Sequence, residues 1–340
     1  MTEHKSRDHG GGLDAAIIRY GGTRADWLDL STGINPAPYK VPEMGGDIWT
    51  ALPDRAAITA LERAARRFWQ VPDTAAILAA PGASSLIVRI PALCPPGTVR
   101  IDTPTYNEHA AAFTAGGWQV NGPAPTARVV VHPNNPDGRF WGGDNPSATL
   151  QIIDESFCDI APTHSHIARA TTPGTLVLKS FGKFWGLAGL RLGFAIGDPA
   201  LIAQLTDMLG PWPVSGPALS IGTAALTDET WASTTRTRLA KDSDRLDTMM
   251  HHAGAALIGG TSLFRLYDTE NAASWQAHLA QHHIWSRIFP YSPTWLRLGL
   301  PHPNRWRQIE TAINTACGTV GGATSPQATS ARPSVRSSGQ

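Results

Sequence analysis

The fold is decided by one stretch of the chain, Ser180-Phe-Gly-Lys-Phe-Trp-Gly-Leu-Ala-Gly-Leu-Arg-Leu-Gly193. One apolar run, Thr175–Leu178, precedes this stretch, and a second, Leu192–Ile196, follows it. Apolar runs of this length are typical of buried strands. Glycines permit tight turns and a close approach of the backbone to other atoms. The sequence therefore predicts a glycine-rich turn that carries a lysine between two buried strands.

Three side chains on this turn have a chemistry that the glycines do not explain. Ser180 and Lys183 are three residues apart, and Arg191 follows eight residues later. A pyridoxal 5'-phosphate (PLP) site needs such a trio, because an amine bonds the cofactor while a hydroxyl and a guanidinium hold its phosphate. A solvated lysine on a mobile surface loop explains this segment alone equally well. The rest of the chain must distinguish the two.

The composition excludes several classes of function. A chain of 340 residues can form two lobes with sizeable cores. Its net charge of +1 predicts binding neither to nucleic acid nor to a membrane surface. Its three cysteines are too few and too scattered for a disulfide framework or a zinc site, so we expect no metal. We find no signal peptide or membrane span and expect a cytoplasmic protein.

Short apolar runs alternate with amphipathic stretches before residue 198. Besides the two runs above, the predicted strands are Ala76–Ala80, Val99–Ile101, Arg128–Val131 and Leu150–Ile153. This alternation predicts an α/β fold, with a mostly parallel sheet covered on both faces. In such sheets the ligand lies beyond the carboxyl ends of the strands. We therefore expect the polar side chains that directly follow strands to meet at one edge: Ser84, Tyr106, Asn135, Asp154 and Lys183.

The pattern changes after residue 198. Helices are predicted to about residue 256, and a smaller α+β lobe follows, with strands at Leu263–Leu266, Ile284–Phe289 and Trp295–Leu298. From Gly318 onward almost no large apolar residue occurs, which predicts disorder. We divide the chain into an N-terminal arm (1–40), a large domain (41–215), a small C-terminal domain (216–317) and a disordered tail (318–340).

Taken together, these features resemble the fold-type-I PLP enzymes, the aspartate-aminotransferase superfamily. Asn135-Pro-Asp-Gly138 is similar to its Asn-Pro-Thr-Gly motif, and Asp154-Glu-Ser-Phe157 is similar to its Asp-Glu-Ala-Tyr/Phe motif. The resemblance implies a mostly parallel seven-stranded sheet in the large domain and a smaller α+β domain. It also implies a homodimer with PLP as cofactor, bonded to Lys183 as the catalytic residue.

The resemblance further implies a role for each residue around the cofactor. Asn135 would bond the phenolic oxygen, and Tyr106 would stack on the ring. Asp154 would keep the ring nitrogen protonated, so that the ring can accept electrons. Phe157 would lie beside the cofactor oxygen, without the hydroxyl that a tyrosine offers. The phosphate would be held by Ala83, Ser84, Ser180 and Arg191.

Longer stretches narrow the match to the threonine-phosphate decarboxylase family of cobalamin biosynthesis. They are His9-Gly-Gly, Trp27–Pro36, Ser180–Phe194 and Gly210–Pro217. This resemblance implies that the small-molecule substrate is L-threonine O-3-phosphate and that the product is (R)-1-aminopropan-2-yl phosphate. A substrate with two anionic groups calls for more than one cation. By resemblance, the substrate would meet His9, Gly33, Asn35, Arg287 and Arg297.

Two other functions stay open, and the chain departs from its relatives at three positions. One alternative is an aminotransferase of the histidinol-phosphate type. The other is a partner-dependent subunit that delivers aminopropanol to an amidating enzyme, although Lys183 argues against it. Leu52 stands where many relatives have a tyrosine that reaches the cofactor of the neighbouring subunit. His132 and Gly12 stand where asparagine is common.

Overall fold

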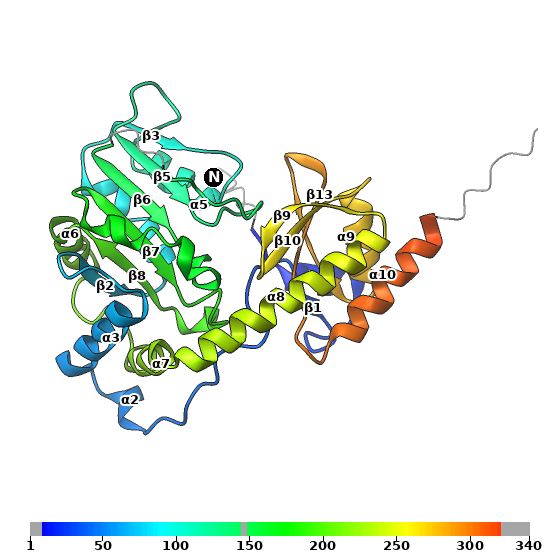
Figure 1. The fold of residues 1–340 in the computed structure, drawn as a ribbon, viewed down its shortest axis with the longest axis horizontal. Coiled ribbons are helices and arrows are strands. Elements are labelled where there is room, and N and C mark those ends of the chain that lie inside the picture. The colour runs from blue at the N-terminus through cyan, green and yellow to red at the C-terminus, as the bar shows by residue number, and fades with distance from the viewer. Residues whose placement is uncertain (1–8, 144–147, 321–340) are drawn as a thin grey trace, which may run out of the picture.

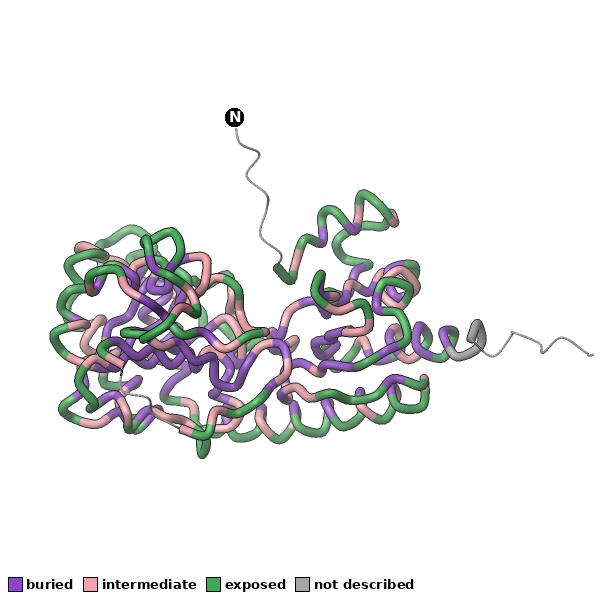
Figure 2. The backbone as a smooth tube through the Cα atoms, turned by 90° about the horizontal axis from the view of Figure 1, so that it is seen from above, coloured by how far each residue is buried: buried purple, intermediate pink, exposed green. Residues whose placement is uncertain are grey.

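The computed structural model describes residues 9–143 and 148–320. Figure 1 shows two lobes side by side, joined by the long helix α8 (Glu229–His252). The buried segments concentrate inside these two lobes, as Figure 2 shows. No helix among the described residues has both the length and the apolar character that crossing a bilayer requires.

The large lobe is built on a seven-stranded sheet in the order β2-β8-β7-β6-β5-β3-β4. Six of the seven strands run in the same direction, and β8 runs antiparallel to both of its neighbours. The prediction of a mostly parallel seven-stranded sheet is confirmed. The strands are β2 (Ala76–Ala80), β3 (Thr98–Ile101), β4 (Gln119–Val120), β5 (Ala127–Val131), β6 (Leu150–Asp154), β7 (Thr175–Ser180) and β8 (Gly193–Gly197).

Helices cover both faces of this sheet because its central strands are apolar on both sides. Side chains alternate along a strand, so Val177 of β7 belongs to one core while Leu176 and Leu178 belong to the other. The first core is covered by α3 (Arg55–Phe68), α7 (Gly216–Thr227) and α8, and the second by α4 (Ala83–Ile87), α5 (Asn107–Ala115) and α6 (Pro199–Leu209).

The small lobe has a four-stranded antiparallel sheet in the order β12-β13-β10-β9. Its strands are β9 (Ala256–Thr261), β10 (Phe264–Asp268), β12 (Arg287–Phe289) and β13 (Ser292–Gly299), and its helices are α9 (Ala272–Gln281) and α10 (Trp306–Val320). The remaining helices are α1 (Leu13–Tyr20), α2 (Asp47–Thr50) and five short 3₁₀ helices, at Ile90–Leu93, Cys158–Ile160, Pro162–His164, Ile167–Thr171 and Ala188–Leu190.

Two predictions from the sequence are wrong in detail. The predicted strand Ile284–Phe289 is two strands, because β11 (Ile284–Trp285) pairs with β1 (Leu28–Asp29) while β12 pairs with β13. The N-terminal arm is thereby fixed to the small lobe. The predicted tail begins too early, because α10 continues to Val320. A single glycine, Gly318, costs a helix only about 1 kcal/mol and does not end it. Residues 321–340 lie outside the described part of the chain.

The other predicted domain boundaries stay predictions. Helix α7 follows the expected boundary at residue 215 but packs closely against α3, beneath the large sheet. The long helix α8 then leads into the small lobe (Figure 1).

Candidate active site

A cavity lies at the carboxyl ends of the parallel strands. Its lining includes all nine residues that the sequence suggested for the cofactor: Ala83, Ser84, Tyr106, Asn135, Asp154, Phe157, Ser180, Lys183 and Arg191. Every one of them comes from the large lobe. They meet because each follows a strand of the same sheet, as the parallel topology requires.

The Lys183 side chain lines this cavity and is half-buried. Its Nζ lies 5.1 Å from the centroid of the Phe157 ring. Burial and the nearby Arg297 guanidinium lower the pKa of Lys183 to about 8, although Asp154 opposes the shift. A neutral amine is the form that can attack a carbonyl carbon. The arm supports this turn from outside, since the Asn35 N–H donates to the Lys183 carbonyl oxygen at 3.0 Å.

Asp154 ends strand β6 and has both carboxylate oxygens held. His109 Nε2 lies 2.8 Å from Oδ2, and Ser156 donates to Oδ1 from its backbone N–H (3.0 Å) and its hydroxyl (2.5 Å). Burial raises the pKa of Asp154, but the hydrogen bonds outweigh it and hold that pKa below its usual value. The carboxylate is therefore ionised. No role for His109 was predicted from the sequence, where its one signal is its place on α5, just after Tyr106.

The part of the cavity around Arg191 and the start of α4 is suited to an anion. Arg191 lies against Gly82, where an added Cβ would stand only 2.5 Å from the guanidinium. Gly82 has φ +83, a conformation that favours glycine. Ala83 and Ser84 then begin α4, where backbone N–H groups lack partners within the helix. The Ser180 hydroxyl accepts from the Gly182 N–H at 3.2 Å.

This set of groups fits PLP. The Lys183 amine lines the cavity, the Asp154 carboxylate is ionised and available for a ring nitrogen, and Tyr106 offers a ring face. The Gly82 turn leaves room for a guanidinium at the anion end, where a side chain would exclude it. One cavity thus brings together the amine, the carboxylate and the cation that this cofactor requires.

A second cavity lies where the two lobes meet, and it shares Tyr106 and Asn135 with the first. His9, Arg287 and Arg297 line it. His9 Nε2 lies 2.9 Å from a carboxylate oxygen of Glu108, and Arg287 donates to the His9 carbonyl oxygen at 2.7 Å. The arm therefore bridges the two lobes beside the cavity.

Arg297 is the buried cation of this second cavity. Its two Nη groups donate to Asn135 Oδ1 and, at 2.6 Å, to the Ser31 carbonyl oxygen. Its Nε is buried and has no hydrogen-bond partner among the described residues. Burial, and next the charge of Arg287, lower the pKa of Arg297 to about 10. Two guanidinium groups that repel each other favour an anion between them.

Gly33 and Asn35, also suggested for the substrate, do not line either cavity. The Asn35 amide donates to the Phe184 carbonyl oxygen at 2.8 Å, and its Oδ1 accepts from Arg238 at 2.6 Å. A Cβ at Gly33 would lie 2.9 Å from the Phe157 ring. Both residues therefore pack the arm against the site. Gly12, at the start of α1, has φ +74, which glycine and asparagine adopt most readily.

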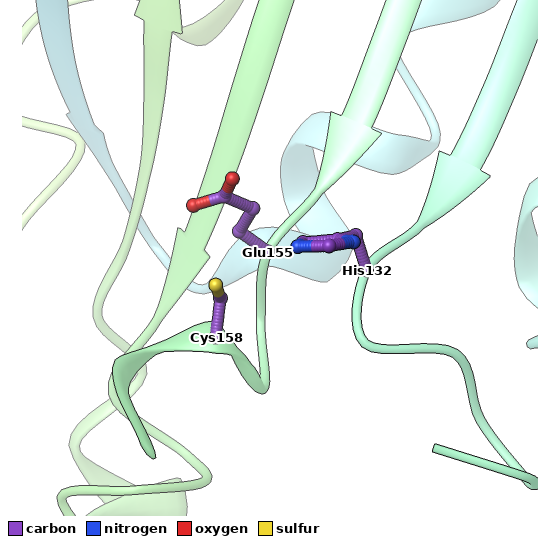
Figure 3. A group of neighbouring side chains, drawn as sticks. All are labelled: His132, Glu155 and Cys158. Carbon is purple, nitrogen blue, oxygen red and sulfur yellow. The ribbon is translucent and has the colours of Figure 1, made fainter. Parts of the chain in front are cut away.

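A buried polar cluster beside the site consists of His132, Glu155 and Cys158 (Figure 3). Their nearest nitrogen, oxygen and sulfur atoms lie within 4.8 Å of one another. His132 Nδ1 accepts from the Trp141 N–H at 3.0 Å, so Nε2 donates to a backbone carbonyl at 2.8 Å. Glu155 accepts from the Lys179 ammonium at 2.6 Å. Burial raises the pKa of the Cys158 thiol. Because these atoms already take part in hydrogen bonds and an ion pair, the cluster is a structural network and not a metal site.

Comparisons with known proteins agree with this geometry. A model of the class I and II aminotransferase family matches residues 147–313. A threonine-phosphate decarboxylase from a Sinorhizobium species is 40% identical over 86% of this chain and 92% of its own. One from Pseudomonas aeruginosa is 36% identical over 90% and 97%. The structure of a histidinol-phosphate aminotransferase from Sinorhizobium meliloti in complex with pyridoxal-5'-phosphate superposes with a TM-score of 0.77 at 17% identity, covering 91% of this chain and 95% of that one.

The relatives match nearly end to end, and the fold and the cavity are those of PLP enzymes of the class I and II aminotransferase superfamily. The chain therefore belongs to the threonine-phosphate decarboxylase family of PLP-dependent enzymes.

Proposed function

We propose that this chain decarboxylates L-threonine O-3-phosphate to (R)-1-aminopropan-2-yl phosphate, which supplies the aminopropanol linker of cobalamin. One observation carries the proposal. Arg287 and Arg297 line a cavity that joins the Lys183 cavity through Tyr106 and Asn135. Two guanidinium groups match a substrate that has both a carboxylate and a phosphate. The relatives that align over nearly their whole length are named for this reaction.

In this proposal the large lobe holds PLP. Lys183 would bond it, Asp154 would pair with the ring nitrogen, and Asn135 would donate to the phenolic oxygen. Tyr106 and Phe157 would contact the ring, and Ala83, Ser84, Ser180 and Arg191 would hold the phosphate. When bound, PLP supplies a ring that accepts the electron pair left at the substrate Cα. Asp154 stays ionised through His109 and Ser156, which keeps that ring positively charged.

The arginines decide which substrate bond breaks. Only a bond perpendicular to the cofactor ring delivers its electrons to it, so decarboxylation needs the carboxylate upright. If Arg297 and Arg287, with His9, bind the substrate phosphate, the carboxylate is free to turn out of the ring plane. Remote binding energy then orients the reacting bond. The Cα–carboxylate bond would break with release of carbon dioxide. Lys183 Nζ, which lines the cavity, would in its protonated ammonium form return one proton to Cα and become the neutral amine.

We propose that the enzyme works as a cytoplasmic homodimer. An apolar groove between α2, α3 and α7 has a volume of about 530 Å³, and Leu52 at its edge is 64% exposed. Trp49 on α2 is 66% exposed. Contiguous exposed apolar surface is typical of interfaces. A second copy would cover it, although Leu52 lacks the tyrosine hydroxyl with which relatives reach the partner's cofactor.

The deciding experiment is product analysis. PLP-loaded protein is incubated with L-threonine O-3-phosphate and no 2-oxo acid, and we expect equimolar carbon dioxide and amine by mass spectrometry. Turnover that requires 2-oxoglutarate and yields glutamate would replace the decarboxylase by an aminotransferase of the histidinol-phosphate type. Product that forms only after addition of an amidating enzyme would favour the partner-dependent subunit.

A further inference from the structure

Next to the substrate cavity, the two lobes are in contact through backbone atoms of glycine residues. A Cβ added at Gly259 of β9 would stand 2.4 Å from the Asp137 carbonyl oxygen, and one at Gly138 would stand 2.0 Å from the Gly260 carbonyl oxygen. Figure 1 shows β9 on the side of the small lobe that faces the large one. The contact therefore requires that residues 138 and 259 have no side chain.

On the large-lobe side, the contact belongs to the loop that carries Asn135. Asn134 fixes this loop: its amide donates to the Pro104 carbonyl oxygen at 3.0 Å and to the Asp137 carboxylate at 2.8 Å. The Thr105 hydroxyl donates to Asn134 Oδ1 at 2.6 Å. The loop is thus held in place by hydrogen bonds within the large lobe, which also holds the cofactor cavity.

On the small-lobe side, the contact lies at the end of one row of residues across the sheet. Arg287 pairs with Arg297, Arg297 pairs with Leu266, and Leu266 pairs with Gly259. Directly paired residues of antiparallel strands point to the same face. The side of Gly259 that lacks a side chain and both guanidinium groups therefore lie on the face of the sheet that points toward the large lobe. A register shift after Leu266 leaves Ile258 as an extra residue, and such bulges re-aim a strand near functional sites.

We propose that Gly259 is a positioning residue for the substrate. Because Gly259 has no side chain, its backbone can contact the Asp137 carbonyl oxygen. This contact sets how far Arg297 and Arg287 lie from Asn135. The hydrogen bond between Arg297 and Asn135 crosses the same interface. The identity of the substrate in this inference rests on the proposed function, whereas the seating contact does not.

The contact between Gly259 and Asp137 should affect substrate binding and not cofactor binding. Ordinary van der Waals contact begins at 3.4 Å, so a methyl group at 2.4 Å from a backbone oxygen forces the lobes about 1 Å apart at this point. The lining of the cofactor cavity belongs wholly to the large lobe, so we expect PLP binding to be retained. The substrate cavity needs both lobes and is distorted. A misplacement of this size costs about tenfold to a hundredfold in kcat/KM.

The test compares Gly259→Ala with Gly142→Ala, where an added Cβ meets nothing within 4 Å. With PLP-loaded dimers and L-threonine O-3-phosphate, we expect Gly259→Ala to raise KM at least tenfold while PLP content and dissociation stay within twofold of the control. Hydrogen–deuterium exchange at residues 134–139 is expected to accelerate without any substrate. An unchanged KM, or a parallel loss of PLP, would overturn the proposal.

Two further measurements keep the inference decidable. If Gly259→Ala does not fold, Asn134→Ala replaces it, because Asn134 fixes the large-lobe loop that Gly259 contacts. This variant is expected to raise KM with PLP retained. An unchanged KM overturns the proposal. If the wild type fails to decarboxylate L-threonine O-3-phosphate, the proposed function falls. The exchange comparison still decides the role of Gly259, because unchanged exchange at residues 134–139 in Gly259→Ala overturns it.

Discussion

The cavity around Lys183 and the cavity around Arg297 share Tyr106 and Asn135, yet they are held in different ways. The first is formed at one edge of a single parallel sheet, whose strands are buried on both faces. The second depends on a four-stranded sheet, the N-terminal arm and their contact with the Asn135 loop. Changes in the first cavity should therefore act on cofactor chemistry, and changes between the lobes should act first on substrate binding.

The largest expected effect comes from removing the charge of the cofactor cavity. Asp154→Asn keeps the shape of the side chain, but an amide cannot hold a ring nitrogen in its protonated form. We expect kcat to fall by several orders of magnitude while much of the PLP is retained. Steady-state kinetics and the visible absorbance of bound cofactor measure the two quantities.

Asp207→Asn is the matched control, because Asp207 is exposed on α6. Turnover near the wild-type rate in Asp154→Asn would show that the carboxylate is structural only. It would also remove the ground for assigning His109 and Ser156 a part in keeping that carboxylate charged.

A smaller effect is expected in the substrate cavity. Arg287→Ala and Arg297→Ala each remove a guanidinium that would face a desolvated anion, a loss on the order of 2–5 kcal/mol. We expect kcat/KM to fall at least tenfold with PLP content unchanged. The exposed Arg307→Ala serves as control. If both variants lose PLP instead, the arginines serve the cofactor or the fold, and the division between the two cavities fails.

The same contrast explains how far the sequence could predict this molecule. Asp154 and Lys183 follow apolar runs that become neighbouring strands, so local patterns place them at one sheet edge. His109 could not be linked to Asp154, because its partner lies 45 residues away and one histidine on a helix has no distinctive pattern. Ile284–Phe289 reads as one strand, and only pairing with β1 from the distant arm divides it.

The substrate side was less predictable for the same physical reason. The family resemblance suggested a substrate contact for Asn35, yet its amide donates to the Phe184 carbonyl oxygen and its Oδ1 accepts from Arg238. Gly259 is one glycine among 33, and its role depends on which backbone lies opposite it. Contacts between lobes are set by tertiary packing and have no local sequence signal.

Lys183 and Arg297 connect the two cavities electrostatically. Burial lowers the pKa of Lys183 first, and the positive charge of Arg297 lowers it further, to about 8. The protonated ammonium is thus disfavoured by the dry surroundings and by repulsion from the substrate cavity. About a tenth of such amines are neutral at pH 7, compared with far less than a hundredth for an ordinary lysine.

The smallest expected effect tests this coupling through pH. Only the neutral amine can bond the PLP aldehyde, so the rate of PLP uptake by the cofactor-free protein should rise roughly tenfold between pH 7 and 9 and then level off. Stopped-flow absorbance measures this rate, and borohydride trapping followed by peptide mapping locates the bond at Lys183. Arg297→Gln removes the repulsion, so its midpoint should move to higher pH, whereas Arg307→Ala should leave it unchanged. A rate that climbs steadily beyond pH 10 in the wild type would mean that Lys183 is an ordinary solvated lysine. An unmoved midpoint in Arg297→Gln would mean that burial alone sets the pKa and that the two cavities are electrostatically independent.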